Sequence, residues 1–146
     1  MPAKKVKSTM EEQLSIYRSM IDFGLVILIW LVQLIIYPAF EFSHRSSFPD
    51  WHRKYMWLIT LFVAPLMFAQ LAFIIYQVYA FRNIMSVISL VLAIFVWVHT
   101  FLRAVPVHNK LSTDGNTKLL VLKLVRVNWL RTVIWTMIWI LGLLLW

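Results

Sequence analysis

The sequence predicts an all-α integral membrane protein that folds as one antiparallel, up-down bundle of four transmembrane helices. Of its 146 residues, 62% are hydrophobic and only 14% are charged, whereas soluble domains average roughly 45–50% apolar and about 25% charged residues. Four long runs contain no charged residue, and a spanning helix needs about 20 mostly apolar residues. Because the backbone must satisfy its own hydrogen bonds in lipid, these runs should be helical.

The N-terminal part should lead into the first span. Residues 1–15 form a polar segment, in which Ser8 or Thr9 can cap a helix because a glutamate follows three residues later. The first span is expected at about residues 20–40, around the charge-free run Phe23–Phe40. The segment 1–15 should therefore supply only a short amphipathic turn before the membrane.

The next three spans are expected at about residues 55–81, 84–105 and 118–146. The last charge-free run, Thr132–Trp146, is short by itself, so its helix should begin near Lys118, with Ser112, Thr113 or Asp114 as its cap. Connections are then expected at residues 41–54, 82–83 and 105–117. Because short connections make neighbouring helices antiparallel, the first and third connections should lie at the same end.

The charge balance indicates a lipid partner and excludes several classes of protein. The net charge of +8 is expected to face anionic headgroups in the cell (inner) membrane, with several passes through it and with the more basic end cytoplasmic. The chain carries no nucleic-acid-binding motif, so no nucleic-acid partner is expected. It has no cysteine and only three glycines, which excludes disulfides, thiol nucleophiles and glycine-rich phosphate loops.

Most of the unusual polar residues, including all four histidines, belong to the end that holds the first and third connections. Residues that share a helical face there are Gln33, Tyr37 and Glu41, then His99 and Arg103, then Asn128, Arg131 and Trp135. Ionisable groups within spans usually face the bundle interior and have partners. We therefore expect one polar cluster in this half, with Glu41 as its acid and Arg103 and Arg131 as counter-charges. The other end, with Asp22, Arg82 and Trp146, should hold no site.

The histidines raise the question of a metal. Glu41, His52, His99 and His108 could supply oxygen and nitrogen ligands, and haem needs only one or two axial histidines. No pair of them has the tight spacing of a metalloprotease helix motif, since His99 and His108 are separated by a proline. We expect no metal and no cofactor, with haem or a metal on these residues as the alternative.

Three strings point to a family. They are Tyr37-Pro38 followed by Trp51-His52-Arg53-Lys54-Tyr55, then Val105-Pro106-Val107-His108-Asn109-Lys110-Leu111, then Asn128-Trp129-Leu130-Arg131-Thr132 with Trp135. From about Gly24 onward the chain resembles a family of small four-helix membrane proteins that includes the anthrone-oxygenase-like proteins. The resemblance implies oxygen insertion into a flat polyketide without a known cofactor, and it points to His52, Tyr55, His108, Asn109, Asn128, Trp129 and Arg131.

Together these features predict a membrane protein that binds or oxygenates a hydrophobic aromatic molecule. In an enzyme, His52 or His108 would act as general base, and Arg131 and Asn128 would stabilise an enolate-like oxyanion. The expected catalytic residues are His52, His108, Arg131 and Asn128. The expected ligand-binding residues are Tyr37, Glu41, Tyr55, His99, Arg103, Asn109, Trp129 and Trp135. The alternative is a non-catalytic subunit or scaffold, in a homo-oligomer or with partner membrane subunits, in which the polar cluster is structural.

Overall fold

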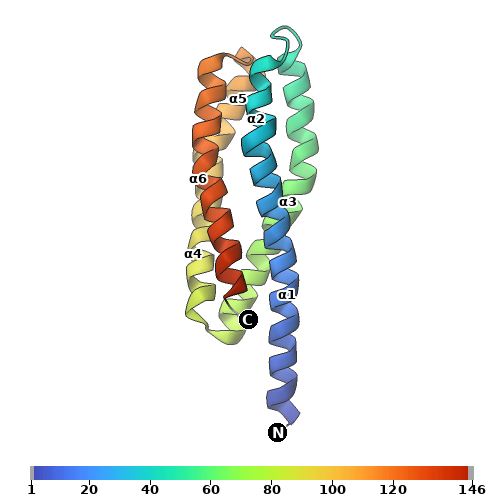
Figure 1. The fold of residues 1–146 in the computed structure, drawn as a ribbon, viewed down its shortest axis with the longest axis vertical. Helices are drawn as coiled ribbons and strands as arrows, with labels where there is room; N and C mark the ends of the chain where they lie inside the picture. Colours follow the sequence, from blue (N-terminus) through green and yellow to red (C-terminus); the bar gives the residue numbers. More distant parts are fainter. Residues whose placement is uncertain (1, 145–146) are drawn as a thin grey trace.

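The computed structural model describes the backbone of residues 2–144 and the side chains of residues 9–144, and it is helical almost throughout (Figure 1). Helices cover 92% of it, and no strand occurs among the described residues. Four helical stretches are long and apolar enough to cross a membrane: Thr9–Phe42, Phe48–Phe81, Ile84–Asp114 and Lys118–Leu143. The predicted number of long apolar helices is confirmed. The predicted place of Trp146 lies outside the described residues.

The first span begins earlier than the sequence predicted. Helix α1 covers Pro2–Leu31 and continues through the π-helix η1 (Val32–Ile36), α2 (Tyr37–Ala39) and the 3-10 turn η2 (Phe40–Phe42). The predicted cap at Ser8 or Thr9 is wrong, because both residues lie inside α1. A proline is tolerated in a first helical turn, where its missing N–H has no partner to lose. Residues 2–15 therefore belong to the helix instead of preceding it.

The long connections predicted at residues 41–54 and 105–117 are also wrong, because a helix that has a proline in its first turn begins within each of them. Helix α3 covers Phe48–Phe81 with Pro49 in its first turn, so the first connection shrinks to residues 43–47. Helix α4 (Ile84–His99) continues through the π-helix η3 (Thr100–Ala104) into α5 (Val105–Asp114), which has Pro106 in its first turn. Only residues 115–117 then precede α6.

Helix α6 covers Lys118–Leu143 and begins where the sequence predicted. Its N-cap residue is Thr117. The predicted caps Ser112, Thr113 and Asp114 are wrong, because they form the last turn of α5. Gly115 has φ +80°, a conformation that glycine adopts without steric cost, and it reverses the chain between the two helices.

Both π-helices precede a proline. Pro38 follows η1 and Pro106 follows η3 within two residues. A proline inside a helix has no N–H to donate and its ring crowds the preceding turn, and a wider π turn relieves this conflict. Single π turns are frequent at functional sites. Here they bring Tyr37 and His108 into the interior, since both side chains are buried.

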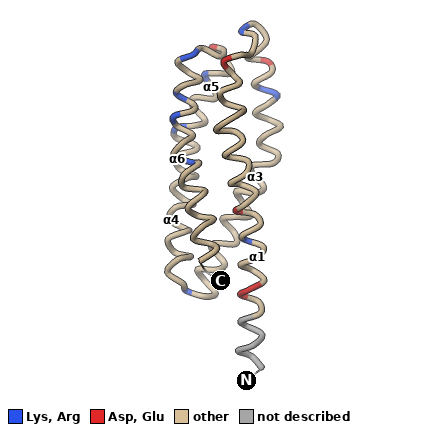
Figure 2. Tube along the Cα trace, viewed as in Figure 1, with Lys and Arg blue, Asp and Glu red and all other residues tan. Residues whose placement is uncertain are grey.

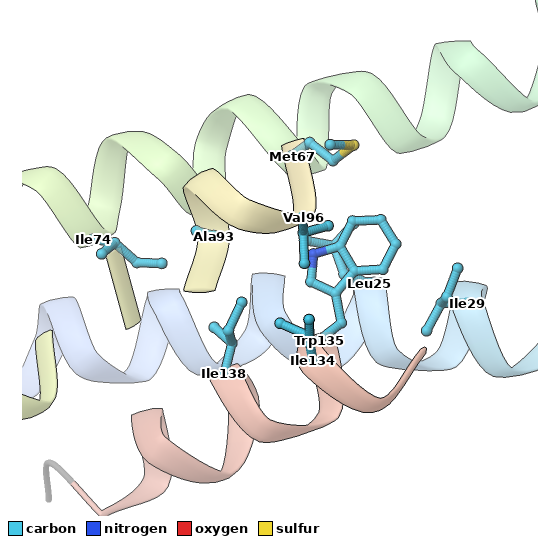
Figure 3. Close-up of a cluster of buried hydrophobic side chains, with 9 residues drawn as sticks. All are labelled: Leu25, Ile29, Met67, Ile74, Ala93, Val96, Ile134, Trp135 and Ile138. Carbon is cyan, nitrogen blue, oxygen red and sulfur yellow. The ribbon is translucent and has the colours of Figure 1, made fainter. Parts of the chain in front are cut away.

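The connections divide the molecule into two ends. Residues 43–47 and 115–117 lie at one end, which we call the histidine end, whereas residues 82–83 and the end of α6 lie at the opposite end (Figure 1). Helices α1 and α4 each pack against both α3 and α6. An apolar core around Trp135, Met67 and Ile138 fills the middle (Figure 3). A second core, around Phe40, Phe48 and Leu124, lies toward the histidine end.

Asn116 joins the two connections at the histidine end, and its loss should be measurable. Its side-chain Nδ2 donates to the carbonyl oxygens of Phe40 (2.6 Å) and Ser43 (2.7 Å). Asn116→Ala should lower the free energy of unfolding by about 1–3 kcal/mol, because two carbonyls lose their donor. The matched variant Asn109→Ala removes an exposed asparagine and should change stability little. Dodecyl sulfate titration in mixed micelles measures both, and equal losses would contradict the prediction.

Candidate functional site

A cavity of about 230 Å³ lies inside the bundle on the side of the histidine end. Its walls come from α1, η1, α2, α3, α4, η3, α5 and α6, and most of the lining side chains are apolar. The ionisable side chains that line it are Tyr37, Tyr55, His108 and Arg131. The cavity is thus an apolar chamber with a single polar, cationic corner.

A chain of hydrogen bonds leads away from this corner. Tyr37 Oη lies 2.9 Å from His108 Nε2, and His108 Nδ1 lies 3.2 Å from His52 Nε2. His52 Nδ1 then lies 2.8 Å from Ser112 Oγ. All four ring nitrogens are bonded, so the two imidazoles act as both donor and acceptor whichever tautomer is present. Because Ser112 is only half-buried, this relay connects the cavity with the surface at the histidine end.

Packing holds the relay rigidly. The His52 and His108 rings lie nearly parallel (21°) with centroids 5.3 Å apart, and the Phe48 ring lies nearly parallel to His52 (26°) at 5.2 Å. Phe40 meets the His52 ring edge-on at 5.5 Å. His52 has no exposed surface. The relay is therefore built into the second apolar core and is not a flexible surface feature.

Arg131 supplies the positive charge of the corner. Its Nη1 donates to Asn128 Oδ1 (3.1 Å), and Asn128 Nδ2 donates to Gln33 Oε1 (2.9 Å). The guanidinium lies 5.1 Å from the centroid of Trp135, within the range of a cation–π interaction. No carboxylate pairs with Arg131 among the described residues, and its Nε has no hydrogen-bond partner. The site therefore holds a cation whose counter-charge is missing.

The structure brings most of the predicted site residues together. Tyr37, Tyr55, His108, Arg131 and Trp135 line the cavity. His52 and Asn128 lie behind it and contact His108 and Arg131. The predicted stripe of Asn128, Arg131 and Trp135 on one helical face is confirmed by these contacts. This arrangement can bind an oxygen atom of a ligand, conduct its proton away and stabilise the anion that remains.

Five predicted ligand-binding residues do not reach the cavity. Glu41 is exposed and lies 3.6 Å from Lys118 at the surface, so its predicted pairing with Arg103 or Arg131 is wrong. The 3-10 turn of η2 carries it out of the face that Gln33 and Tyr37 share. Asn109 is exposed, and Trp129 is 41% exposed and packs edge-on against Trp30.

His99 and Arg103 share a face, as predicted, but they line a different, surface groove. This separation bears on the candidate metal ligands. His52 and His108 are neighbours, whereas Glu41 is paired at the surface and His99 lies in that groove. Within the described part of the chain, no group of three or more His, Asp or Glu side chains converges as a metal site would require.

The sequence analysis missed a second buried polar cluster, which lies toward the opposite end. Arg18 Nε donates to Asp22 Oδ2 (3.2 Å), and Arg18 Nη1 donates to Gln77 Oε1 (2.7 Å). Gln70 Nε2 donates to Asp22 Oδ1 (2.7 Å), and Gln77 Nε2 lies 3.5 Å from Ser15 Oγ. All five side chains are buried. The expectation that the unusual polar side chains gather at the histidine end is therefore incomplete, because the opposite end also has a polar interior.

Two signals for this cluster were present in the sequence. Arg18 and Asp22 are spaced by four, so they share a helical face, and Gln70 and Gln77 are seven apart on a strongly apolar helix. Trp135 connects the two polar regions, because its Nε1 donates to Gln70 Oε1 (3.1 Å) while Arg131 lies over its ring. The cavity is thus linked to the buried ion pair through Trp135 and Gln70.

No family model, no curated protein and no solved structure matches this chain. The resemblance to the anthrone-oxygenase-like family stays a prediction, and the function is argued from the geometry.

Proposed function

We propose that the chain is a multi-pass protein of the cell's inner membrane, inserted as an antiparallel four-span bundle, and that its cavity binds a flat hydrophobic aromatic molecule carrying a polar oxygen. The observation that carries this proposal is the unpaired guanidinium of Arg131 at one corner of an apolar cavity. Such a site favours a ligand with a large apolar body and one anionic or hydrogen-bonding oxygen.

The outer surface supports insertion in a bilayer. Large apolar side chains are exposed all along the four spans, for example Ile35, Phe62, Val91 and Val133 at 63%, 64%, 62% and 48%. Soluble monomers rarely expose contiguous apolar surface on this scale. Exposing this apolar surface to water would cost free energy, whereas contact with lipid acyl chains would not.

The position of the cavity suggests entry from the bilayer. Its lining includes the exposed side chains of Thr60 and Phe68 on α3 and of Phe101 on η3. The cavity therefore reaches the lateral surface between these helices, at a level where the surface is apolar. A hydrophobic ligand would enter from lipid with its oxygen first, directed toward Arg131, and its apolar part would follow.

The volume limits the size of the ligand. An engineered cavity of about 150 Å³ binds a single benzene ring, and the cavity here measures about 230 Å³. It accommodates roughly two fused rings, and a larger molecule would extend through the lateral opening.

The relay would serve the oxygen of such a ligand. A ligand hydroxyl beside Tyr37 Oη can pass its proton to Tyr37 while Tyr37 passes its own to His108. The transfer continues through His52 to Ser112, whose hydroxyl releases its own proton to water. Arg131 then stabilises the oxyanion. Removal of this proton is the first step that a cofactor-independent oxygenase would need, so the geometry is compatible with the activity that the resemblance implies.

Two matched ligands test the proposal: 1-naphthol and naphthalene, which differ by one hydroxyl. Arg131→Gln should weaken binding of 1-naphthol by about tenfold to a hundredfold, since a hydrogen bond to a charged group contributes about 1.5–3 kcal/mol. Binding of naphthalene should change little. Equilibrium dialysis of protein-loaded against empty nanodiscs measures both affinities and corrects for partition into lipid.

The control is Arg45→Gln, which removes an exposed arginine at the same end. It should leave both affinities unchanged. If the native protein binds neither ligand, while Arg131→Gln only lowers thermal stability, the cluster is structural. The scaffold alternative then replaces the binding proposal.

A further inference from the structure

A second hollow lies on the outer surface, separate from the cavity. It is a groove of about 370 Å³ between the α4–η3–α5 stretch and α6. The residues that give it its character are His99, Leu102, Arg103, Lys110, Lys123 and Arg126. Four of these six side chains are permanent cations, and neither an aspartate nor a glutamate lines the groove.

These four cations have no acidic partner among the described side chains. In the described part of the chain the ion pairs are Arg18 with Asp22, Arg53 with Asp50, and Lys118 with Glu41. Figure 2 shows lysines and arginines gathered along α5 and the first half of α6, with few acidic residues near them. Four like charges around one groove repel each other, and an anion bound between them relieves this repulsion.

The level of the groove along the bundle, relative to the hydrocarbon core of a bilayer, indicates which anion it binds. The charge-free run Ile84–Leu102 measures about 28 Å as a helix at 1.5 Å per residue, close to the ~30 Å thickness of the hydrocarbon core. Arg103 is therefore the first charge above the hydrocarbon, at the level of lipid phosphates. Arg126 faces it across the groove from α6.

Apolar surface continues from the groove toward the bilayer centre. Phe95, one turn deeper than His99 and stacked on its ring at 6.2 Å, is 45% exposed. Leu130, one turn deeper than Val127 of the groove, is 43% exposed. The surface is cationic at headgroup level and apolar directly below. It is therefore complementary to a phospholipid, which has an anionic phosphate above apolar acyl chains.

We propose that this groove binds the phosphate of an anionic phospholipid between Arg103 and Arg126, with Lys110 and Lys123 around the headgroup and the acyl chains along Phe95 and Leu130. Basic pockets between transmembrane helices recognise anionic headgroups in this way. The site is independent of the cavity, because none of its residues lines that cavity.

The test compares two double variants with the same loss of charge. Arg103→Gln with Arg126→Gln should weaken retention of phosphatidylglycerol by about thirtyfold, since each cation near a headgroup strengthens binding by about fivefold. Arg45→Gln with Lys54→Gln removes two exposed cations outside the groove and should weaken it by about twofold at most, because salt screens distant charges. Native mass spectrometry of detergent-purified protein, titrated with phosphatidylglycerol or phosphatidylcholine, measures retention.

Three outcomes would overturn the proposal: equal losses in the two double variants, equal retention of phosphatidylcholine, or displacement of the lipid by equimolar inorganic phosphate. The last would assign the groove to free phosphate. If Arg103→Gln with Arg126→Gln lowers the melting temperature, Lys110→Gln with Lys123→Gln replaces it and should again weaken phosphatidylglycerol more than the control does.

Discussion

Asp22→Ala is expected to lower the free energy of unfolding by about 3–5 kcal/mol, because it leaves the Arg18 cation buried without its counter-charge. Both residues are 1% exposed, and the Arg18 Nε to Asp22 Oδ2 distance is 3.2 Å. Gln70 Nε2 also loses its acceptor, and Arg18 Nη2 already has no hydrogen-bond partner. Dodecyl sulfate titration in mixed micelles measures the loss.

Two further variants establish the cause. Adding Arg18→Met to Asp22→Ala should recover part of the lost stability, since no unpaired charge then remains in the interior. Glu41→Ala breaks a pair with Lys118 at the surface and should cost less than about 1 kcal/mol. If Asp22→Ala costs no more than Glu41→Ala, or if Arg18→Met deepens the loss, the ion pair does not stabilise the bundle.

The ion pair also shows where prediction from the sequence stops. The four charge-free runs predicted four long helices, because the length and composition of each run are sufficient for this prediction, whichever helices pack beside it. The helix ends at residues 81, 84 and 118 were predicted correctly, whereas those beside the first and third connections were not. Pro49 and Pro106 lie within the predicted connections, whereas a proline in a first turn is compatible with the helix that it begins. The polar connections at residues 48–54 and 105–114 are in fact helical.

The site was predictable where its residues share one helix. Asn128, Arg131 and Trp135 are spaced at three and four, so their common face follows from the helical period. Their partners Gln33 and Gln70 come from other helices, and the contact depends on how each helix is rotated about its own axis. Two π turns change that rotation before Tyr37 and His108, and Glu41 leaves the shared face in the 3-10 turn. Local spacing alone does not encode these rotations.

Trp135→Ala is the second large expected effect, because this side chain connects the cavity with the buried ion pair. The residue is 2% exposed, packs in the central core (Figure 3), lines the cavity and donates to Gln70 Oε1. Truncating a buried tryptophan costs about 3–5 kcal/mol, and here it also removes the ring beneath Arg131. The same titration in mixed micelles measures the loss.

The ring and the N–H of Trp135 can be separated. Trp135→Phe keeps an aromatic ring but leaves Gln70 Oε1 without its donor, so it should cost about 1–3 kcal/mol. Trp139→Phe is the matched control, since Trp139 lies one turn further along α6 and its buried Nε1 has no hydrogen-bond partner. Removing an N–H that bonds to nothing should be neutral or stabilising. Equal costs for the two phenylalanine variants would mean that the Trp135–Gln70 bond contributes nothing.

Trp135→Ala also tests the size limit of the cavity. The native cavity of about 230 Å³ accommodates roughly two fused rings, and loss of the indole should let the three-ring molecule anthracene bind inside. The affinity for anthracene, measured by nanodisc dialysis, should rise relative to that for naphthalene in Trp135→Ala but not in Trp135→Phe. If the ratio is unchanged, Trp135 does not bound the space that the ligand occupies, and the ligand must lie nearer to Tyr55 and the lateral opening.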